Sequence, residues 1–305
     1  MTTQNITESN MIKSKSKVST SRILKSRFFR MLSKSRTGIL GLIIVLLVIS
    51  CAIFAPLIAP YEPTKINTDM LLAAPAWLDG GSMAHLLGTD HLGRDILSRI
   101  IYGSRISLLV GGASVIVAGI VGVTFGLLSG YFGGIIDSFF MRLADSFLAL
   151  PTILFALVFL TVLEPGILTL IFILGVTNWV IYARLVRGDT LVIREKEYVK
   201  AAKSMGVSDF KIITRHILPN IFSSVIIVST LTVASTIIAE SSLSFLGLGV
   251  QVPDITWGIM LSEGRDYLAT SWWIATFPGI AITITVLGII FLGEWLRDYL
   301  DPKSV

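Results

Sequence analysis

Six long apolar stretches divide the chain, and polar segments separate them. The stretches lie at residues 38–59, 106–129, 143–163, 166–186, 220–244 and 273–293. Each has about the 20 residues that a helix needs to cross the hydrocarbon core of a membrane. None shows the alternation of a barrel strand, and helices satisfy their own backbone hydrogen bonds in lipid. The pattern therefore predicts an all-α integral membrane protein with six transmembrane helices.

The composition supports a chain that faces lipid. Apolar residues make up 53% of the 305 positions, charged residues only 15%, and the mean hydropathy is +0.79. A soluble domain averages about 25% charged residues, because its surface must be solvated. The single cysteine, Cys51, excludes an internal disulfide or a Cys-based metal site. Val48–Cys51 loosely matches a lipoprotein cleavage box, but the apolar run continues beyond Cys51, so we expect this residue to pack within the first helix.

The basic residues predict the orientation. If the N-terminus lies in the cytoplasm, 20 Lys and Arg residues fall on the inner side and only five on the outer side. Both termini are then cytoplasmic. The expected organisation is a basic cytoplasmic segment at 1–37, a first transmembrane helix at 38–59, an extracytoplasmic loop with an amphipathic helix at 60–105, a five-helix core at 106–293 and a cytoplasmic C-terminus at 294–305.

A charged segment at 187–219 interrupts the apolar pattern on the inner side. Residues 194–205 are good helix formers, and Gly206 suits the left-handed end of such a helix. Ser208 can cap a second short helix, with Asp209 favourable in its first turn. From the residues alone, two interpretations are equally good. One is a helical knob that a partner protein contacts, and the other is an amphipathic hairpin that rests on the lipid surface.

Two further polar groups need an explanation. Arg94, Asp95 and Arg99 lie beside an apolar face in the outer loop, and the spacing of Asp95 and Arg99 allows a surface ion pair. An interfacial anchoring helix and a docking or gating element both fit. Glu240 lies within the fifth span, where an acid is costly and faces a cavity or a partner, so we expect a structural or pathway-lining role.

Glycines recur in the second span. They lie at positions 111, 112, 119, 122 and 126, together with Ala113 and Ala118. Small residues let membrane helices approach closely. We therefore expect tight helix packing there rather than chemistry.

Several motifs resemble one transporter family. Ala201-Ala202, Gly206 and Leu218-Pro219 match, in spacing, the signature loop of importer-type ABC transporter permeases. Lys200 stands where that signature has Glu, and His216 stands where it has Ile, as in the peptide-transporter branch. Four more segments resemble the second, C-type permease of dipeptide, oligopeptide and nickel importers: His85–Asp90 with Leu92–Asp95, Gly130–Gly134, Ser242–Gly249 and Leu296–Pro302.

The resemblance implies the fold of a type I ABC importer permease with cytoplasmic coupling helices, placed in the bacterial inner membrane. It implies a homologous permease as heterodimer partner, two cytoplasmic ABC ATPases and an extracytoplasmic solute-binding protein, with no nucleic acid. The expected ATPase-coupling residues are Glu197, Tyr198, Ala201, Ala202, Gly206, Ser208, Asp209, His216, Leu218 and Pro219. Candidates for the pathway or its gate are Glu240, Ser244 and Phe245, and those for binding-protein docking are Arg94, Asp95, Arg99 and Trp257.

The chain carries no signature of catalysis. It has no Gly-Lys pair and hence no P-loop, so we expect partner subunits to hydrolyse ATP and this chain to bind no cofactor and no metal. A secondary transporter would show an inverted repeat with broken helices, and an intramembrane enzyme would show a nucleophile with its base. We expect dipeptides or short oligopeptides as the transported solute. Nickel or metal-chelate complexes, glutathione and opine-like compounds are the alternatives.

Overall fold

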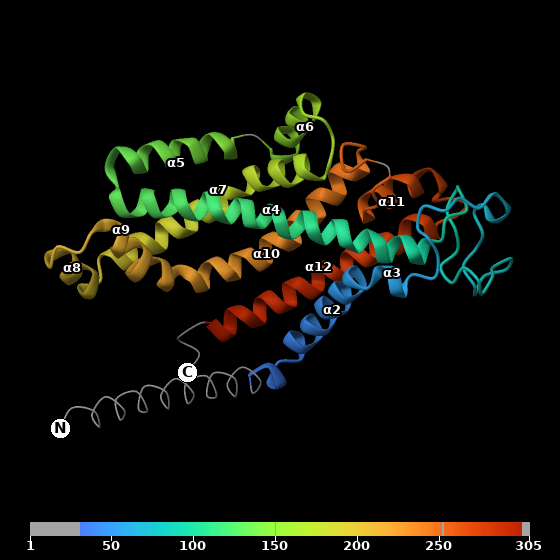
Figure 1. Cartoon of the computed structure of the whole chain (residues 1–305), viewed down its shortest axis with the longest axis horizontal. Coiled ribbons are helices and arrows are strands. Elements are labelled where there is room, and N and C mark those ends of the chain that lie inside the picture. Colours follow the sequence, from blue (N-terminus) through green and yellow to red (C-terminus); the bar gives the residue numbers. More distant parts are fainter. Residues whose placement is uncertain (1–30, 150, 252, 301–305) are drawn as a thin grey trace, which may run out of the picture.

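The computed structural model describes residues 31–149, 151–251 and 253–300, and within them the chain is an elongated helical bundle (Figure 1). Segments 1–30 and 301–305 lie outside the described residues, and with them most of the expected basic N-terminal segment. The helices are α2 (Arg36–Ile53), α3 (Ala55–Ile58), α4 (Ile96–Phe132), α5 (Gly134–Leu148), α6 (Thr152–Val162), α7 (Ile167–Arg194), α8 (Glu197–Ser204), α9 (Asp209–Ile212), α10 (Leu218–Phe245), α11 (Trp257–Gly264) and α12 (Trp273–Leu300). A π-helical turn, Ile213–Ile217, joins α9 to α10.

Among the described residues, five helices are long and apolar enough to cross a membrane: α2, α4, α7, α10 extended back through α9, and α12. A sixth span results if α5 and α6 count as one bent element. The predicted all-α membrane architecture is confirmed. The expected first span, 38–59, is nevertheless split into α2 and α3, and Pro56 lies in the first turn of α3, where a missing N–H costs nothing.

The amphipathic helix expected in the outer loop is continuous with the second span. Its residues form the first turns of α4, which runs without a break for 37 residues. At 1.5 Å per residue such a helix is about 55 Å long, well beyond the hydrocarbon core of about 30 Å. Asp95 starts the helix, because its carboxylate accepts a hydrogen bond from the backbone N–H of Ser98. A helix of this length therefore extends beyond the hydrocarbon core at one end or at both.

The third expected span, 143–163, is broken near its middle. α5 ends at Leu148, and α6 starts after Pro151 at an angle of 89° to α5. Proline lacks a backbone donor and disfavours helix in the residue before it, so the sequence stops the helix at this point. Figure 1 shows α5 lying alongside α4 and α7, with α6 turned away.

The glycines of α4 allow its close contact with α7. A Cβ on Gly122 would lie 2.3 Å from the carbonyl oxygen of Trp179, and one on Gly126 would lie 2.7 Å from that of Ala183. Gly130 meets Thr190 and Arg187 in the same way. The expected tight packing is therefore confirmed for part of the glycine set. Gly112 has no neighbour within 4 Å at its Cβ position, and the nearest atom to that of Gly119 is 3.9 Å away.

The two ends of the bundle differ. α8 and α9 project at one end, whereas the long loop between α3 and α4 lies at the opposite end with α11 (Figure 1). The core between them joins residues of α2, α10, α11 and α12, among them Val48, Ile237, Trp257 and Val286. A second cluster, including Leu127, Val186, Ile212 and Ile221, holds the α8–α9 end together.

Candidate functional site

The α8–α9 segment is a tight helical hairpin. Residue Gly206 has φ +77°, the left-handed conformation that glycine adopts without strain. The N–H of Val207 donates to the carbonyl of Ala202 at 3.1 Å, and that of Gly206 donates to Lys203 at 3.0 Å. Together these two bonds close a Schellman motif. Thus the expected helix end at Gly206 is confirmed, and the motif fixes the direction in which the chain leaves α8.

The second short helix starts as expected but ends differently. Ser208 occupies its N-cap position, although the Ser208 side chain makes no capping hydrogen bond, and Asp209 lies in the first turn. The helix does not stop before the membrane span, because the π-helical turn leads directly into α10. Pro219 lies in the first turn of α10, where its missing N–H is tolerated. The segment is therefore continuous with the fifth span.

Polar contacts fasten the hairpin to α4, and α4 to the end of α7. The Tyr131 hydroxyl of α4 donates to the Asp209 carboxylate at 2.5 Å, and the Arg194 guanidinium of α7 donates to the carbonyl of Gly130 in α4 at 2.7 Å. The ammonium of Lys203 lies 5.8 Å from the centre of the Tyr131 ring, within cation–π range. These contacts link the hairpin to α4, and the continuous chain links it to α10.

Ala202 does not lie on the surface that a partner could contact. It is only 4% exposed, and with Val199 it faces the chain's own core. Tyr198, Ala201 and Gly206 are exposed. The exposed face also carries Met205 and Phe210, which are 77% and 78% exposed. Sequence reasoning did not select these two as site residues, although their signal was present: large apolar side chains on either side of the Gly206 turn.

Lys200, which stands where the family signature has Glu, has a partner in its own chain. Its ammonium forms an ion pair with Glu195 at 2.9 Å, and both side chains are exposed. The hydrogen bond from Lys200 lowers the pKa of the Glu195 carboxyl. His216, in the π-helical turn, is half-buried, and its ring lies 6.4 Å from that of Tyr198. Leu218 is half-buried, whereas Pro219 is exposed.

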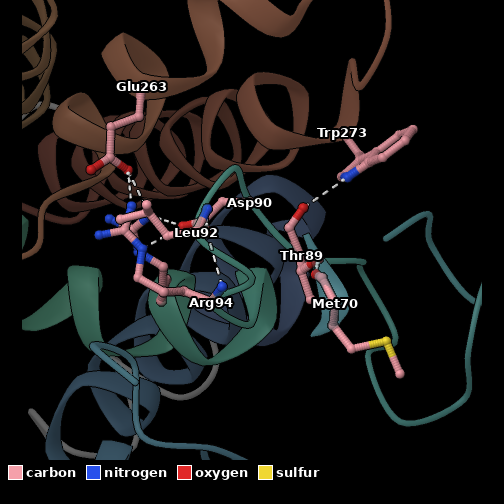
Figure 2. A network of polar contacts seen from close by, with 8 residues as sticks. Met70, Thr89, Asp90, Leu92, Arg94, Glu263 and Trp273 are labelled. Carbon is pink, nitrogen blue, oxygen red and sulfur yellow. Dashed lines mark hydrogen bonds and ion pairs between the residues drawn. The ribbon is translucent and has the colours of Figure 1, made fainter. Parts of the chain in front are cut away.

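At the opposite end, a buried ion-pair cluster holds the outer loop to α4 and α11 (Figure 2). Arg94 Nε donates to Asp90 Oδ2 at 2.7 Å, and Arg94 Nη2 donates to Glu263 Oε2 at 3.0 Å. Arg99 Nη1 contacts the same two carboxylate oxygens, that of Glu263 at 2.6 Å. Thr89, next to Asp90, accepts a hydrogen bond from the Trp273 indole at 3.2 Å.

The expected surface ion pair between Asp95 and Arg99 is wrong. Arg99 is 2% exposed and binds Asp90 and Glu263, because the loop folds back over the start of α4. Asp95 instead contacts His85 Nδ1 at 2.9 Å. Burial alone would raise the pKa of Asp90, but Arg99, Arg94 and two backbone N–H groups outweigh it and lower that pKa.

The candidate docking residues are thus interior residues of this chain. Arg94, Asp95 and Arg99 are buried, and Trp257 is 1% exposed, with its indole N–H donating to the carbonyl of Ile100 at 2.9 Å. They bind the outer loop and α11 to α4. Contact with a binding protein stays a prediction for these four side chains, whose observed contacts are internal.

Glu240 lies next to two serine hydroxyls within the bundle. It is fully buried, and the Ser244 hydroxyl donates to its Oε1 at 2.7 Å. Ser241 contacts Oε2 at 3.4 Å. Phe245, one turn beyond Ser241, lines a surface cavity of about 460 Å³ between α10 and α12. These contacts support the structural role for Glu240 and Ser244, while the pathway role stays a prediction.

A bundle of five or six helices that are long and apolar enough to cross a membrane, counted over the described residues, defines the class: a multi-pass membrane protein. The chain belongs to the family of binding-protein-dependent transport system inner membrane components, whose model matches residues 122–305. A second model, the N-terminal transmembrane domain of oligopeptide transport permease C, matches residues 24–75. The chain is therefore an inner-membrane transport permease and not an enzyme, and in this family separate ATPase subunits hydrolyse ATP.

Similar proteins carry peptide-transport names. The chain is 40% identical to the di/tripeptide transport system permease protein DppC of Pseudomonas aeruginosa, over 90% of this chain and 91% of the relative. It is 39% identical to the dipeptide permease DppC of Haemophilus influenzae, over 90% and 94%. The glutathione transport system permease GsiD of Pectobacterium atrosepticum is 40% identical, over 90% of each chain.

A solved structure supports the fold. The MetNI methionine ABC transporter, in an inward-facing conformation, contains a chain that matches with a TM-score of 0.56. The identity is 17%, and the match covers 68% of this chain and 98% of the other. The helices therefore have the arrangement of a type I ABC importer permease.

Proposed function

We propose that this chain is the permease subunit of an ATP-driven, binding-protein-dependent importer of dipeptides or short oligopeptides. It pairs with a homologous permease, two cytoplasmic ATPases and an extracytoplasmic solute-binding protein. Support for the peptide substrate comes from relatives at about 40% identity that are named as dipeptide permeases and match nine-tenths of this chain. Both termini are cytoplasmic in this proposal, in agreement with the 20-to-5 distribution of basic residues.

The α8–α9 hairpin is the ATPase-coupling element in this proposal. The observation that carries it is the exposed apolar tip formed by Met205 and Phe210, on a hairpin that the hydrogen bond from Tyr131 to Asp209 fastens to α4. Large exposed apolar side chains mark a contact surface. A lipid-surface hairpin would also bury such residues, but the fixed attachment to the bundle suits a lever that turns ATPase motion into helix motion.

The test replaces the apolar tip. We expect Met205→Asp with Phe210→Asp to abolish capture of the ATPase subunits by the purified permease pair and to abolish peptide uptake into proteoliposomes. A matched control is Met83→Asp, since Met83 is 79% exposed but lies in the outer loop at the opposite end. If the tip variant captures the ATPases as well as the wild type does, the coupling role of this hairpin is wrong.

Glutathione is the second candidate solute, because one relative of equal identity is named for it. Uptake of a labelled dipeptide, such as dialanine, in the presence of the cognate binding protein separates the two. We expect unlabelled dipeptides to compete and glutathione to leave dialanine uptake unchanged. Uptake of labelled glutathione, with no uptake of labelled dialanine, would reverse the assignment.

A further inference from the structure

A second cavity, of about 420 Å³, opens at the outer-loop end of the bundle. Three segments form it: residues 62–64 after α3, the outer part of α4, and residues 253–255 before α11. Its lining includes three charged side chains, Glu62, Arg105 and Asp254, together with Tyr102 and Pro253. The cavity lies far from the α8–α9 hairpin, at the other end of the molecule (Figure 1).

Among the described residues, the three charged side chains of this cavity form no ion pair. All three side chains are exposed. Within the described residues, Arg105 and Asp254 form no ion pair and no side-chain hydrogen bond, and Glu62 only accepts from the Thr64 hydroxyl at 3.3 Å. By contrast, Arg99, six residues before Arg105 on the same helix, is buried and bound to two carboxylates. The outer part of α4 thus has one arginine for structure and one that is available to a partner.

The walls of the cavity are held in place by hydrogen bonds. The backbone N–H of Tyr61 donates to the Ser98 hydroxyl at 3.0 Å, which fixes the segment that carries Glu62 against α4. Trp257 fixes the third wall, through its indole N–H to Ile100 at 2.9 Å and its backbone N–H to the Ser107 hydroxyl at 3.3 Å. A preformed site loses little entropy when a partner binds.

We propose that this cavity docks the extracytoplasmic solute-binding protein. A protruding segment of that protein pairs a Lys or Arg with Glu62 and Asp254, and an Asp or Glu with Arg105. This inference rests on the proposed function, which requires such a partner at the end opposite the ATPases. The exposed charges favour a protein segment over a free peptide, because small-ligand sites enclose most of the ligand within mainly apolar walls.

The experiment measures binding of the cognate solute-binding protein, loaded with dialanine, to the complete importer in lipid nanodiscs. We expect Arg105→Glu to reduce the association rate constant and the affinity by about tenfold at low salt, since rim charges act mainly on association. Asp254→Lys should give a similar loss. Arg265→Glu is the matched control: it makes the same charge change at the same end, on an exposed arginine outside the cavity.

The outcomes separate the possibilities. Losses with Arg105→Glu and Asp254→Lys, but not with Arg265→Glu, in complexes that assemble normally, support the docking site. Affinities within twofold of the wild type overturn it. Binding of free dialanine to the importer without the binding protein, abolished by Arg105→Glu, also overturns it, because the occupant is then the peptide itself. If the wild-type importer does not bind the binding protein at all, the proposed function fails rather than this site.

Discussion

The contact between α4 and α7 gives the sharpest test of the fold. A Cβ at Gly122 would lie 2.3 Å from the carbonyl oxygen of Trp179 and 2.5 Å from Cβ of Tyr182. Ordinary contact needs about 3.4 Å, so Gly122→Ala must increase the separation of the two backbones by roughly 1 Å at this point. Overpacking of this kind costs about 1–3 kcal/mol.

Gly112→Ala is the matched control, because it makes the same change on the same helix with nothing within 4 Å of the new Cβ. Both variants gain the same helix propensity, about 1 kcal/mol in soluble helices, so their difference isolates the clash. The assay is thermal unfolding of the purified permease in mild detergent. We expect Gly122→Ala to unfold at a lower temperature than Gly112→Ala. Equal unfolding temperatures would refute the close approach of α4 and α7.

Three other predictions concern charged side chains. Arg99→Met removes one of the two arginines that pair with Asp90 and Glu263, so we expect the free energy of unfolding to fall by about 3–5 kcal/mol. The control Arg265→Met, at an exposed site, should change the free energy of unfolding by less than about 0.5 kcal/mol. The lowered pKa of Asp90 means that its stabilising effect is complete above the ordinary carboxyl pKa of about 3.9 and is lost as the pH falls through the lower folded-state pKa. The difference in melting temperature between wild type and Asp90→Asn should therefore shrink below about pH 4, and a constant difference down to pH 2 would contradict the pairing. Lys200→Glu restores the usual residue of the family signature but places a second negative charge beside Glu195. Since both side chains are exposed, we expect the melting temperature and the dialanine uptake to stay unchanged. A large loss of uptake would show that Lys200 itself contacts the ATPase.

The hairpin at 197–212 shows which features of the site could be predicted from the sequence. Gly206 predicted the end of α8, because few other residues adopt a positive φ without strain. The orientation of the side chains was not predictable to the same degree. Ala201 and Ala202 are neighbours in the motif, yet one is exposed and the other is buried against the chain's own core. Which of two adjacent helical residues faces a partner depends on how the helix is fastened to the bundle.

The ion pairs were the least predictable part. Arg99 stands four residues after Asp95, which is the spacing of a local pair, but its partners Asp90 and Glu263 come from the folded-back loop and from α11. Glu263 is 164 residues away in the sequence. Local spacing shows which pairs can form on an isolated helix, whereas burial decides which charges must be paired.

The sequence by itself determined the class, the helical architecture, most of the spans and the turn at Gly206, because lipid burial and positive φ leave few alternatives for those residues. The tertiary structure alone decided that the outer helix is the start of α4, that α6 leaves α5 at an angle of 89°, and that Arg94, Asp95 and Arg99 are interior residues. These features depend on contacts between segments that are distant in the chain, or on a bend whose direction packing sets. The same structure decided that Arg105 and Asp254 form no ion pair with the described residues, although both line one cavity.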